Sequence, residues 1–284
     1  ARCDFSKVQQ PLNGNGETKS LEQFNRSLHF GQFTPRFSMQ YLSSHNQLFY
    51  ASVSKGYKAG GFNVSFLNND DYLYSPEYNW NYEIGTKLSF LNNRLSADLS
   101  LFYIDWRNQQ ITNTIPTVGN VIRNAGRSRN KGIEASFQAR PTKSWMMYMN
   151  YGYTDARFVH YQKEERGILK DYGGNYLPMV PRHTFSLTTG YSFYDICSWI
   201  DRLTLNAGVS VTGPIYWYED NQAKQSPYAL VNLRISINKG CFTWEAWSKN
   251  LTNTDYLSYY FVTSKAYAQK GKPITLGTSV SISL

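Results

Sequence analysis

The sequence predicts an all-β protein, a transmembrane antiparallel up-and-down β-barrel with about 11 strands in this chain. Apolar and polar residues alternate with a period of two along nearly the whole chain, and no window has the periodicity of an amphipathic helix. Several alternating runs extend over roughly 10–13 residues, beyond the about 5–6 of globular strands and near the roughly 9–11 that cross a bilayer at a tilt. Short and long connections follow one another strictly, as in outer-membrane barrels.

Alternation alone does not say which face of a sheet points inward. A soluble β-sandwich or propeller that buries its apolar face is therefore the alternative fold. Strand length, loop asymmetry and aromatic strand ends together favour the membrane barrel.

The composition excludes a helical membrane protein. Aromatic residues make up 16% of the 284 residues, with 23 Tyr and 16 Phe, yet the mean hydropathy is −0.50. No apolar run approaches the roughly 18 residues of a spanning helix. A membrane β-barrel fits both observations, because its lipid-facing and lumen-facing residues alternate and average to a polar score.

The hairpin "NWNYEIGTKLSFLNNRLSADLSLFY" illustrates the pattern, since Asn92 and Asn93 form a tight turn between two stripes of alternating apolar residues. A segment from Phe24 to Phe33 is an alternative twelfth strand. We expect residues 1–33 to be a loop, with the end of a preceding strand as the alternative, and residues 34–284 to form barrel. The predicted apolar stripes are Phe37–Tyr41, Phe49–Val53, Trp80–Phe90, Leu95–Tyr103, Ile133–Ala139, Trp145–Tyr153, Phe185–Phe193, Leu203–Val211, Val231–Ile237, Phe242–Ala246 and Ile274–Leu284.

In an up-and-down meander every second connection lies at the same end, so all short turns are expected on the periplasmic side and all long loops outside. Within the third long loop, the stretch Lys163–Gly174 is expected as a short helix or a mobile lid. The predicted short turns are Ser43–Asn46, Asn92–Asn93, Pro141–Ser144, Tyr194–Asp201 and Asn238–Gly240. The predicted long loops are Ala59–Tyr78, Asn108–Asn120, Val159–Pro181, Tyr216–Ser226 and Leu251–Gly271.

Aromatic residues gather at the strand ends, where their amphipathic rings favour the headgroup level of a bilayer. We expect them to form two girdles. They include Trp80, Tyr82, Tyr103, Trp106, Trp145, Tyr191, Phe193, Tyr194, Trp244 and Trp247.

Charge does not favour a nucleic-acid partner. The net charge is +9 and the pI is near 9.3, but the basic residues are scattered and only Arg123–Gly132 is dense. The first residues are polar and contain no signal-peptide core, which indicates either a processed piece or a cytosolic protein.

No catalytic, metal or cofactor site is predicted. The four histidines are isolated along the sequence, and no Ser/His/Asp or paired-carboxylate arrangement stands out. Cys3, Cys197 and Cys241 have no metal-ligand spacing. A Cys197–Cys241 disulfide and two free thiols both remain open.

Four ordered motifs resemble those of TonB-dependent outer-membrane receptors. They are "LFYASVSKGYKAGGFN" from Leu48, "YSPEYNWNYEIGTKLSFLNNRLSADLSLFYIDWRNQQI" from Tyr74, "NAGRSRNKGIEASFQARPT" from Asn124 and "SKNLTNTDY" from Ser248. The resemblance spans Phe33 to Leu284. It implies the C-terminal half of a 22-stranded barrel that is filled by an N-terminal plug. The sequence contains neither a plug nor a TonB box, and it ends on Leu284 where the family usually has an aromatic residue.

The resemblance also implies a function. The expected activity is energy-coupled uptake of a scarce nutrient across the bacterial outer membrane, with a ferric siderophore first and haem, cobalamin or oligosaccharide as alternatives. The expected partners are the N-terminal half of the barrel and its plug, the TonB-ExbB-ExbD complex acting through the plug, and outer-membrane lipid. A passive porin or structural barrel and a soluble extracellular binding module are the other hypotheses.

Two groups of residues are candidates for contacts. Polar residues on the strands would point into the lumen, where family analogy favours plug contacts over water: Glu83, Lys87, Asp98, Glu134, Gln138, Asn150, Arg234 and Glu245. Aromatic and cationic loop residues would suit an anionic, aromatic ligand such as a catecholate metal chelate, with packing of loop on loop as the alternative: Tyr57, Lys58, Phe62, Tyr161, Lys163, Arg166, Tyr172, Tyr216, Trp217 and Tyr218.

Overall fold

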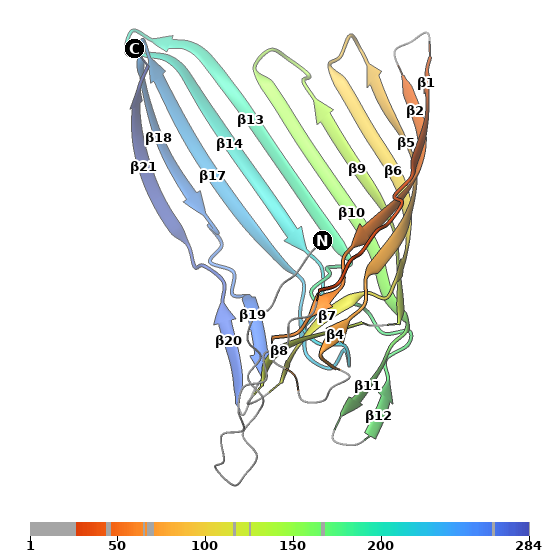
Figure 1. Ribbon diagram of the computed structural model, residues 1–284. Coiled ribbons are helices and arrows are strands. Elements are labelled where there is room, and N and C mark those ends of the chain that lie inside the picture. Colours follow the sequence, from red (N-terminus) through yellow and green to blue (C-terminus); the bar gives the residue numbers. More distant parts are fainter. Residues whose placement is uncertain are drawn as a thin grey trace.

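The computed structural model describes residues 27–43, 47–64, 66, 71–115, 118–124, 126–165, 168–262 and 265–283. One antiparallel sheet of 11 strands dominates the described chain, and it curves into an open trough (Figure 1). This confirms the predicted all-β class and strand number. Residues 27–35 lie in no strand, so the described part of the alternative twelfth strand is not one. The strands, in sheet order, are β1 (Arg36–Leu42), β2 (Leu48–Lys58), β5 (Glu77–Phe90), β6 (Leu95–Arg107), β9 (Arg127–Ala139), β10 (Trp145–His160), β13 (His183–Cys197), β14 (Ile200–Thr212), β17 (Tyr228–Lys239), β18 (Phe242–Lys249) and β21 (Thr275–Ile282).

Each strand of the large sheet pairs with the next one along the chain, once the small hairpins in the long loops are set aside. Several strands are long enough to cross a bilayer with residues to spare, and β10 has 16 residues. Across the described ranges, no helix is long and apolar enough to span a membrane.

All five long connections end in a two-stranded hairpin, and these hairpins project from one end of the trough (Figure 1). The short turns lie at the other end, as the alternation of connection lengths predicts. The expected helix at Lys163–Gly174 is wrong, because its described residues contribute to a hairpin, while the mobile lid stays a prediction. The hairpins pair β3 (Gly61–Phe62) with β4 (Leu73–Tyr74), β7 (Gln110–Ile115) with β8 (Gly119–Asn124), β11 (Gln162–Glu165) with β12 (Ile168–Asp171), β15 (Ile215–Tyr216) with β16 (Lys224–Gln225), and β19 (Leu257–Val262) with β20 (Ala266–Lys270).

The apolar stripes share one face of the large sheet, which we call the outer face. Register carries Ile84 opposite Leu101, and Leu101 opposite Ile133, so the stripe continues from strand to strand. These side chains are not covered by a second sheet: Ile84 is 56% exposed and Leu276 is 71% exposed. A soluble sandwich would bury them, so the membrane barrel is the fold that accounts for this face.

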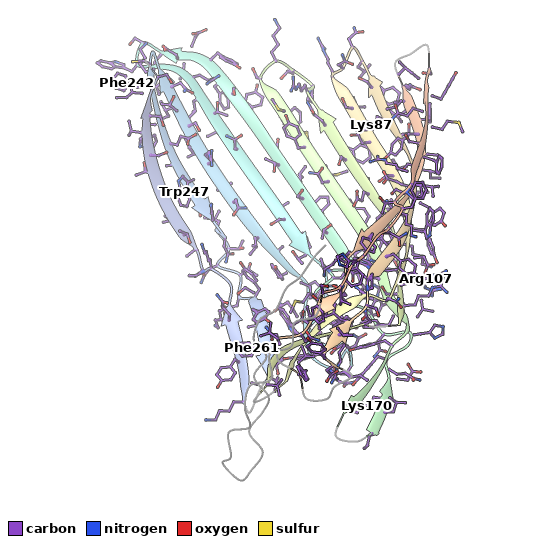
Figure 2. All side chains as sticks on the ribbon, viewed as in Figure 1. Lys87, Arg107, Lys170, Phe242, Trp247 and Phe261 are labelled. Carbon is purple, nitrogen blue, oxygen red and sulfur yellow. The ribbon has the colours of Figure 1, made fainter. Side chains whose placement is uncertain are left out.

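Three of the predicted girdle residues lie on the opposite face, which we call the lumen face. Trp247 lies opposite Arg234 and Gly277, and a Cβ on that glycine would stand 2.2 Å from the indole. Trp106 lies opposite Ser128 on the neighbouring strand. By contrast, Phe242 points outward at the short-turn end (Figure 2). Tyr194 lies opposite Arg202, one residue from the outer-face pair of Phe193 and Leu203, and it lines a hollow on the lumen face. The interpretation of Trp106, Tyr194 and Trp247 as girdle residues is therefore corrected.

The short turns are fixed by local backbone chemistry. Asn92 and Asn93 adopt φ values of 54° and 67°, a left-handed conformation that asparagine tolerates. The Asp201 carboxylate accepts hydrogen bonds from Lys239 at 2.7 Å and from the Gly240 backbone at 2.8 Å. This carboxylate ties two neighbouring short turns together.

The two outermost strands leave the sheet open. Within the described residues, β1 pairs only with β2 and β21 only with β18. A free strand edge in hydrocarbon costs several kcal/mol for each unsatisfied backbone group. A closed barrel therefore requires further strands between β21 and β1.

The two faces predict opposite responses to a buried charge. Leu99→Lys on the outer face should destabilise the intact protein by about 2–4 kcal/mol near the bilayer midplane. Ser136→Lys should cost clearly less. Ser136 lies on the lumen face, next in sequence to Ala135, which pairs with Leu99 on the outer face. Denaturant titrations of protein refolded into lipid bilayers give both values; equal costs would mean that the faces are assigned the wrong way round.

Candidate functional site

The lumen face carries all eight of the predicted lumen residues. Cross-strand pairing places each of them on the side of the sheet opposite the apolar stripe; Lys87 is labelled in Figure 2. They are Glu83, Lys87, Asp98, Glu134, Gln138, Asn150, Arg234 and Glu245.

Several of these groups bond to one another across neighbouring strands. The Tyr50 hydroxyl donates to Glu83 Oε1 at 2.7 Å. Glu245 Oε1 accepts from Ser236 at 2.8 Å and lies 3.7 Å from Arg234 Nη1. The lumen wall is thus a surface of partly matched charges and hydroxyls that can also bond to contents of the lumen.

Other lumen candidates are paired more loosely. Lys87 lies directly opposite Asp98 on the neighbouring strand. The Asn150 amide donates to Ser186 Oγ at 3.2 Å. With its amide turned so that the oxygen faces Arg140, Gln138 accepts two hydrogen bonds from that guanidinium.

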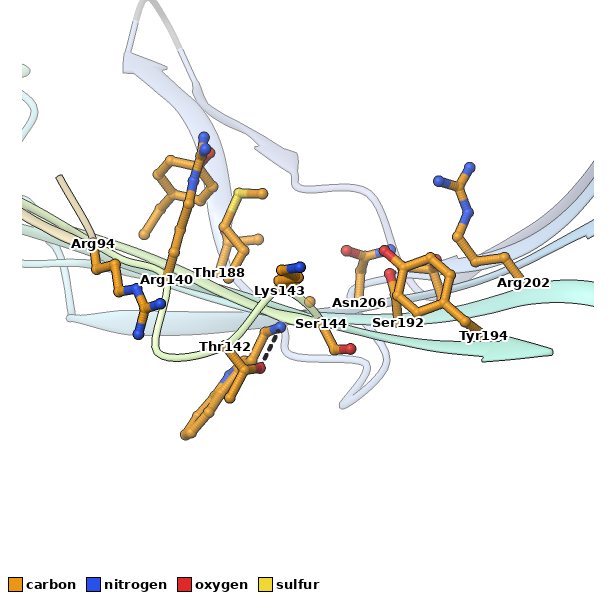
Figure 3. A pocket seen from close by; sticks show the side chains of 15 residues that line it. Arg94, Arg140, Thr142, Lys143, Ser144, Thr188, Ser192, Tyr194, Arg202 and Asn206 are labelled. Carbon is orange, nitrogen blue, oxygen red and sulfur yellow. Dashed lines mark hydrogen bonds between the residues drawn. The ribbon is translucent and has the colours of Figure 1, made fainter. Parts of the chain in front are cut away.

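A half-open hollow of about 550 Å³ lies on the lumen face at the short-turn end (Figure 3). Four cationic side chains line it, Arg94, Arg140, Lys143 and Arg202, and its lining contains no carboxylate. Thr142 Oγ1 accepts from the Trp145 backbone at its edge. Uncompensated positive charge in a concave wall attracts anionic groups.

At the other end, the loops pack on a small apolar core. Phe158 is 1% exposed, and its ring lies 4.7 Å from that of Tyr161, which in turn lies 5.8 Å from Tyr172. Leu177 completes the described core. Tyr161 and Tyr172 therefore pack inside the loops. This matches the alternative of loop-on-loop packing, rather than ligand contact, for these two candidates.

A polar junction connects the β11–β12 and β15–β16 hairpins. Glu219 accepts from Lys163 at 3.4 Å through its carboxylate and from the Asn175 amide at 2.8 Å through its backbone oxygen. Asn221 bonds to the backbone of Tyr176 in both directions, at 2.7 and 3.0 Å. Lys163 thus contributes to loop architecture, and Arg166 lies outside the described residues.

A second junction fixes the first two long loops. The Asn63 amide donates to the backbone oxygens of Asp71 and Ile122, and its oxygen accepts from the Ile122 N–H at 2.8 Å. The Asp71 carboxylate receives two hydrogen bonds from Arg123, at 2.6 and 2.5 Å. Phe62 is 7% exposed beside this junction and packs on Tyr72 at 5.2 Å.

Tyr57 and Lys58 lie where β2 enters the loops. Lys58 Nζ is 4.0 Å from Glu77, whose carboxylate also accepts from the Gln110 backbone. Tyr57 lies opposite Tyr78. These two candidates are more accessible than Phe62, Tyr161 and Tyr172.

The richest aromatic surface is formed by the β15–β16 and β19–β20 hairpins. Trp217 is buried against Tyr259 and Tyr260, each with a ring distance of 6.4 Å. Phe261, labelled in Figure 2, continues the row to Tyr267 through a stacked contact of 5.0 Å. Tyr259, Phe261 and Tyr267 are 40–47% exposed. None of these three is among the predicted ligand-binding residues. The stretch "YLSYYF" in a predicted long loop contains Tyr259 and Phe261 and was the available signal for those two.

The remaining candidates support this aromatic surface. Tyr216 stacks on Tyr176 at 5.5 Å with an angle of 8°. The Tyr218 hydroxyl accepts from the Val262 backbone at 2.5 Å. Burial raises the pKa of Tyr218, so this hydroxyl stays neutral at physiological pH.

The described part of the chain contains no group of three His, Cys, Asp or Glu residues placed to hold a metal ion. Cys197 and Cys241 are exposed and free in this structure.

The family follows from a sequence match over most of the chain. Residues 1–253 match the family model described as TonB dependent receptor-like, beta-barrel. The chain belongs to this TonB-dependent receptor family. The resemblance carried by the four motifs is thereby confirmed, and the location is the outer membrane.

Relatives of this TonB-dependent receptor barrel are transport receptors rather than enzymes. The chain is 26% identical over 241 residues to the probable TonB-dependent siderophore receptor PiuA of Acinetobacter baumannii, covering 79% of the chain and 30% of PiuA. It is 26% identical over 262 residues to the pesticin receptor of Yersinia pestis, covering 88% and 36%. The chain thus spans about a third of the length of the curated relatives it matches.

Solved structures show the same fold. The ferric yersiniabactin uptake receptor FyuA of Yersinia pestis superposes with a TM-score of 0.75 at 23% identity, covering 92% of this chain and 38% of that one. The siderophore receptor PiuA of Acinetobacter baumannii gives a TM-score of 0.73 at 21% identity, covering 93% and 37%.

Asn63 should be required for loop order but not for the barrel. Asn63→Ala removes three hydrogen bonds and leaves buried backbone groups unsatisfied, which should cost about 1–3 kcal/mol locally. Limited proteolysis of the receptor in detergent should then cut faster within residues 59–76 and 108–126. Asn63→Asp keeps the acceptor for the Ile122 N–H and should have a smaller effect, and cleavage unchanged in both variants would contradict the proposed junction.

Proposed function

We propose that this chain forms the C-terminal half of the barrel of an outer-membrane receptor that imports a ferric siderophore by TonB-dependent active transport. The observation that carries the proposal is an aromatic loop surface above a polar lumen in a chain whose relatives are siderophore receptors. In this proposal the preceding strands and a plug close and fill the barrel, and the TonB-ExbB-ExbD complex acts on the plug.

The aromatic surface formed by the β15–β16 and β19–β20 hairpins suits an iron chelate for chemical reasons. Tyr259, Phe261 and Tyr267 offer exposed ring faces and edges on one hairpin, where planar aromatic groups can stack. The nine described loop candidates divide into two groups by their burial and contacts. Tyr57, Lys58, Tyr216 and Tyr218 remain proposed ligand contacts, while Phe62, Tyr161, Lys163, Tyr172 and Trp217 hold the loops in place.

The proposed plug contacts follow from the lumen face. A sheet wall that presents Lys87, Glu134 and Arg234 to the lumen needs water or polypeptide there, because unmatched charges are costly when desolvated. A plug that bonds to this wall would also keep the barrel from conducting small solutes, which separates the proposal from a passive porin.

Transport provides the direct test. The complete receptor gene, expressed in a strain without other iron receptors, should allow uptake of radioactive iron from one class of ferric chelate among catecholate, hydroxamate and phenolate probes. Uptake should stop when TonB is deleted or the proton gradient is dissipated. Uptake that persists without TonB, with open conductance in planar bilayers, would instead establish the porin alternative.

The exposed aromatic row should contribute to ligand affinity. Tyr259→Ala combined with Tyr267→Ala removes two ring faces, and loss of about 0.5–1.5 kcal/mol for each should weaken chelate binding by roughly 5- to 150-fold. Binding to whole cells measures this at low temperature, where transport is slow. Trp199→Ala, which removes an 82% exposed ring at the short-turn end, is the matched control and should bind like the parent.

A further inference from the structure

Six cationic residues form a cluster on the outer face, at the end of the sheet that carries the long loops. We call it the outer basic cluster: Arg107, Arg127, Arg129, Lys131, Arg157 and Arg182. Figure 2 shows Arg107 on the outside of the curved sheet toward the loops. The first five lie on β6, β9 and β10, which are neighbours in the sheet.

Only two carboxylates accompany these six cations. Asp105 is shared by Arg107 at 3.1 Å and Arg127 at 2.6 Å, one on each oxygen. Asp155 is shared by Arg157 at 2.7 Å and, at 4.0 Å, by Lys131. The cluster therefore keeps a net charge of +4.

Arg129 and Arg182 are the two cations of the cluster that form no ion pair with these carboxylates among the described residues. Arg129 is exposed. It lies directly opposite Arg157 on β10 and directly opposite Asp105 on β6, whose carboxylate is held by Arg107 and Arg127. Like charges directly opposite each other on one face of a sheet are destabilising, so an anion between the Arg129 and Arg157 guanidinium groups would turn a repulsive pair into a bridged one.

A second pair of guanidinium groups contacts one aromatic ring, because Arg157 and Arg182 lie 4.0 and 4.9 Å from the ring centre of Tyr176. Arg157 also donates hydrogen bonds to the Asp155 carboxylate, the Gly174 backbone oxygen and the Tyr176 hydroxyl, and these use three of its five N–H groups. The Nε of Arg182 is buried without a hydrogen-bond partner among the described residues. Planar guanidinium groups with free N–H donors are suited to phosphate, which they bind through two parallel hydrogen bonds.

The position of the cluster along the strands indicates which anion it meets. On β10, Tyr153 is followed along the same face by Asp155 and Arg157, and on β6 Tyr103 is followed by Asp105 and Arg107. Aromatic rings of this kind lie at the headgroup level of a bilayer, and one further step along a strand face advances about 7 Å. The cluster therefore meets lipid headgroups, and it faces away from the lumen and its cargo.

We propose that the outer basic cluster binds the phosphate groups of an outer-leaflet lipid headgroup, with Arg129, Arg157 and Arg182 as its central contacts. The lipid would neutralise the cross-strand repulsion and fix the height of the barrel in the membrane. The proposal is independent of which nutrient the receptor transports.

The test uses the complete receptor, purified, stripped of lipid and titrated in turn with lipopolysaccharide, with phosphatidylglycerol and with inorganic phosphate, while native mass spectrometry counts bound molecules. Lipopolysaccharide should bind most tightly. Each cation removed should weaken it by about fivefold, so Arg129→Gln with Arg157→Gln should lose roughly 25-fold. Phosphate that binds as tightly as the lipid would overturn the lipid assignment.

Two further variants keep the test decisive. Lys170→Gln with Lys270→Gln removes the same charge from hairpins beyond the cluster and should leave the affinity for lipid unchanged. Arg129→Lys with Arg157→Lys keeps the charge but loses the paired hydrogen bonds, and it should bind with intermediate affinity even if the glutamine variant fails to fold. Unchanged affinity in the lysine variant, or equal losses in the cluster and control variants, would overturn the proposal.

Discussion

Backbone hydrogen bonding in the absence of water is the constraint on which this structure depends. Inside hydrocarbon each unpaired N–H or C=O costs several kcal/mol, so a spanning sheet must pair every strand on both sides. The nine inner strands satisfy this condition, whereas β1 and β21 do so on one side only. Further strands are therefore needed for the fold itself, because both edges of the sheet lack a partner.

The same pairing explains how much of the fold the sequence could predict. A strand exposes alternate residues to lipid and lumen, so local alternation is enough to place Ile84 and Leu99 outward and Glu83 and Asp98 inward. The error at Trp247 has the same origin. It is three residues from Trp244, and an odd spacing puts two side chains on opposite faces, so aromatic content alone assigned Trp247 wrongly.

The packing of the long loops could be predicted less well because its contacts are long-range. Tyr161 and Tyr172 are buried in one cluster with Phe158. No local sequence pattern predicts this packing. The stretch after Tyr161 is rich in Lys and Glu, residues that favour helices in isolation, yet the chain there forms a hairpin supported by its junction with Glu219. Tertiary contacts thus override local propensity in the loops, where ligand recognition is proposed.

Strand register also separates two kinds of recognition on one wall. A one-residue step moves a side chain from the lumen to the lipid, so Asn130 faces inward while its neighbours Arg129 and Lys131 face outward at nearly the same height. Positive charge can therefore accumulate at the lipid headgroups without entering the lumen. A barrel wall can adjust its fit to the membrane through one set of alternate residues and its fit to cargo and plug through the other, and a substitution in one set leaves the other in place.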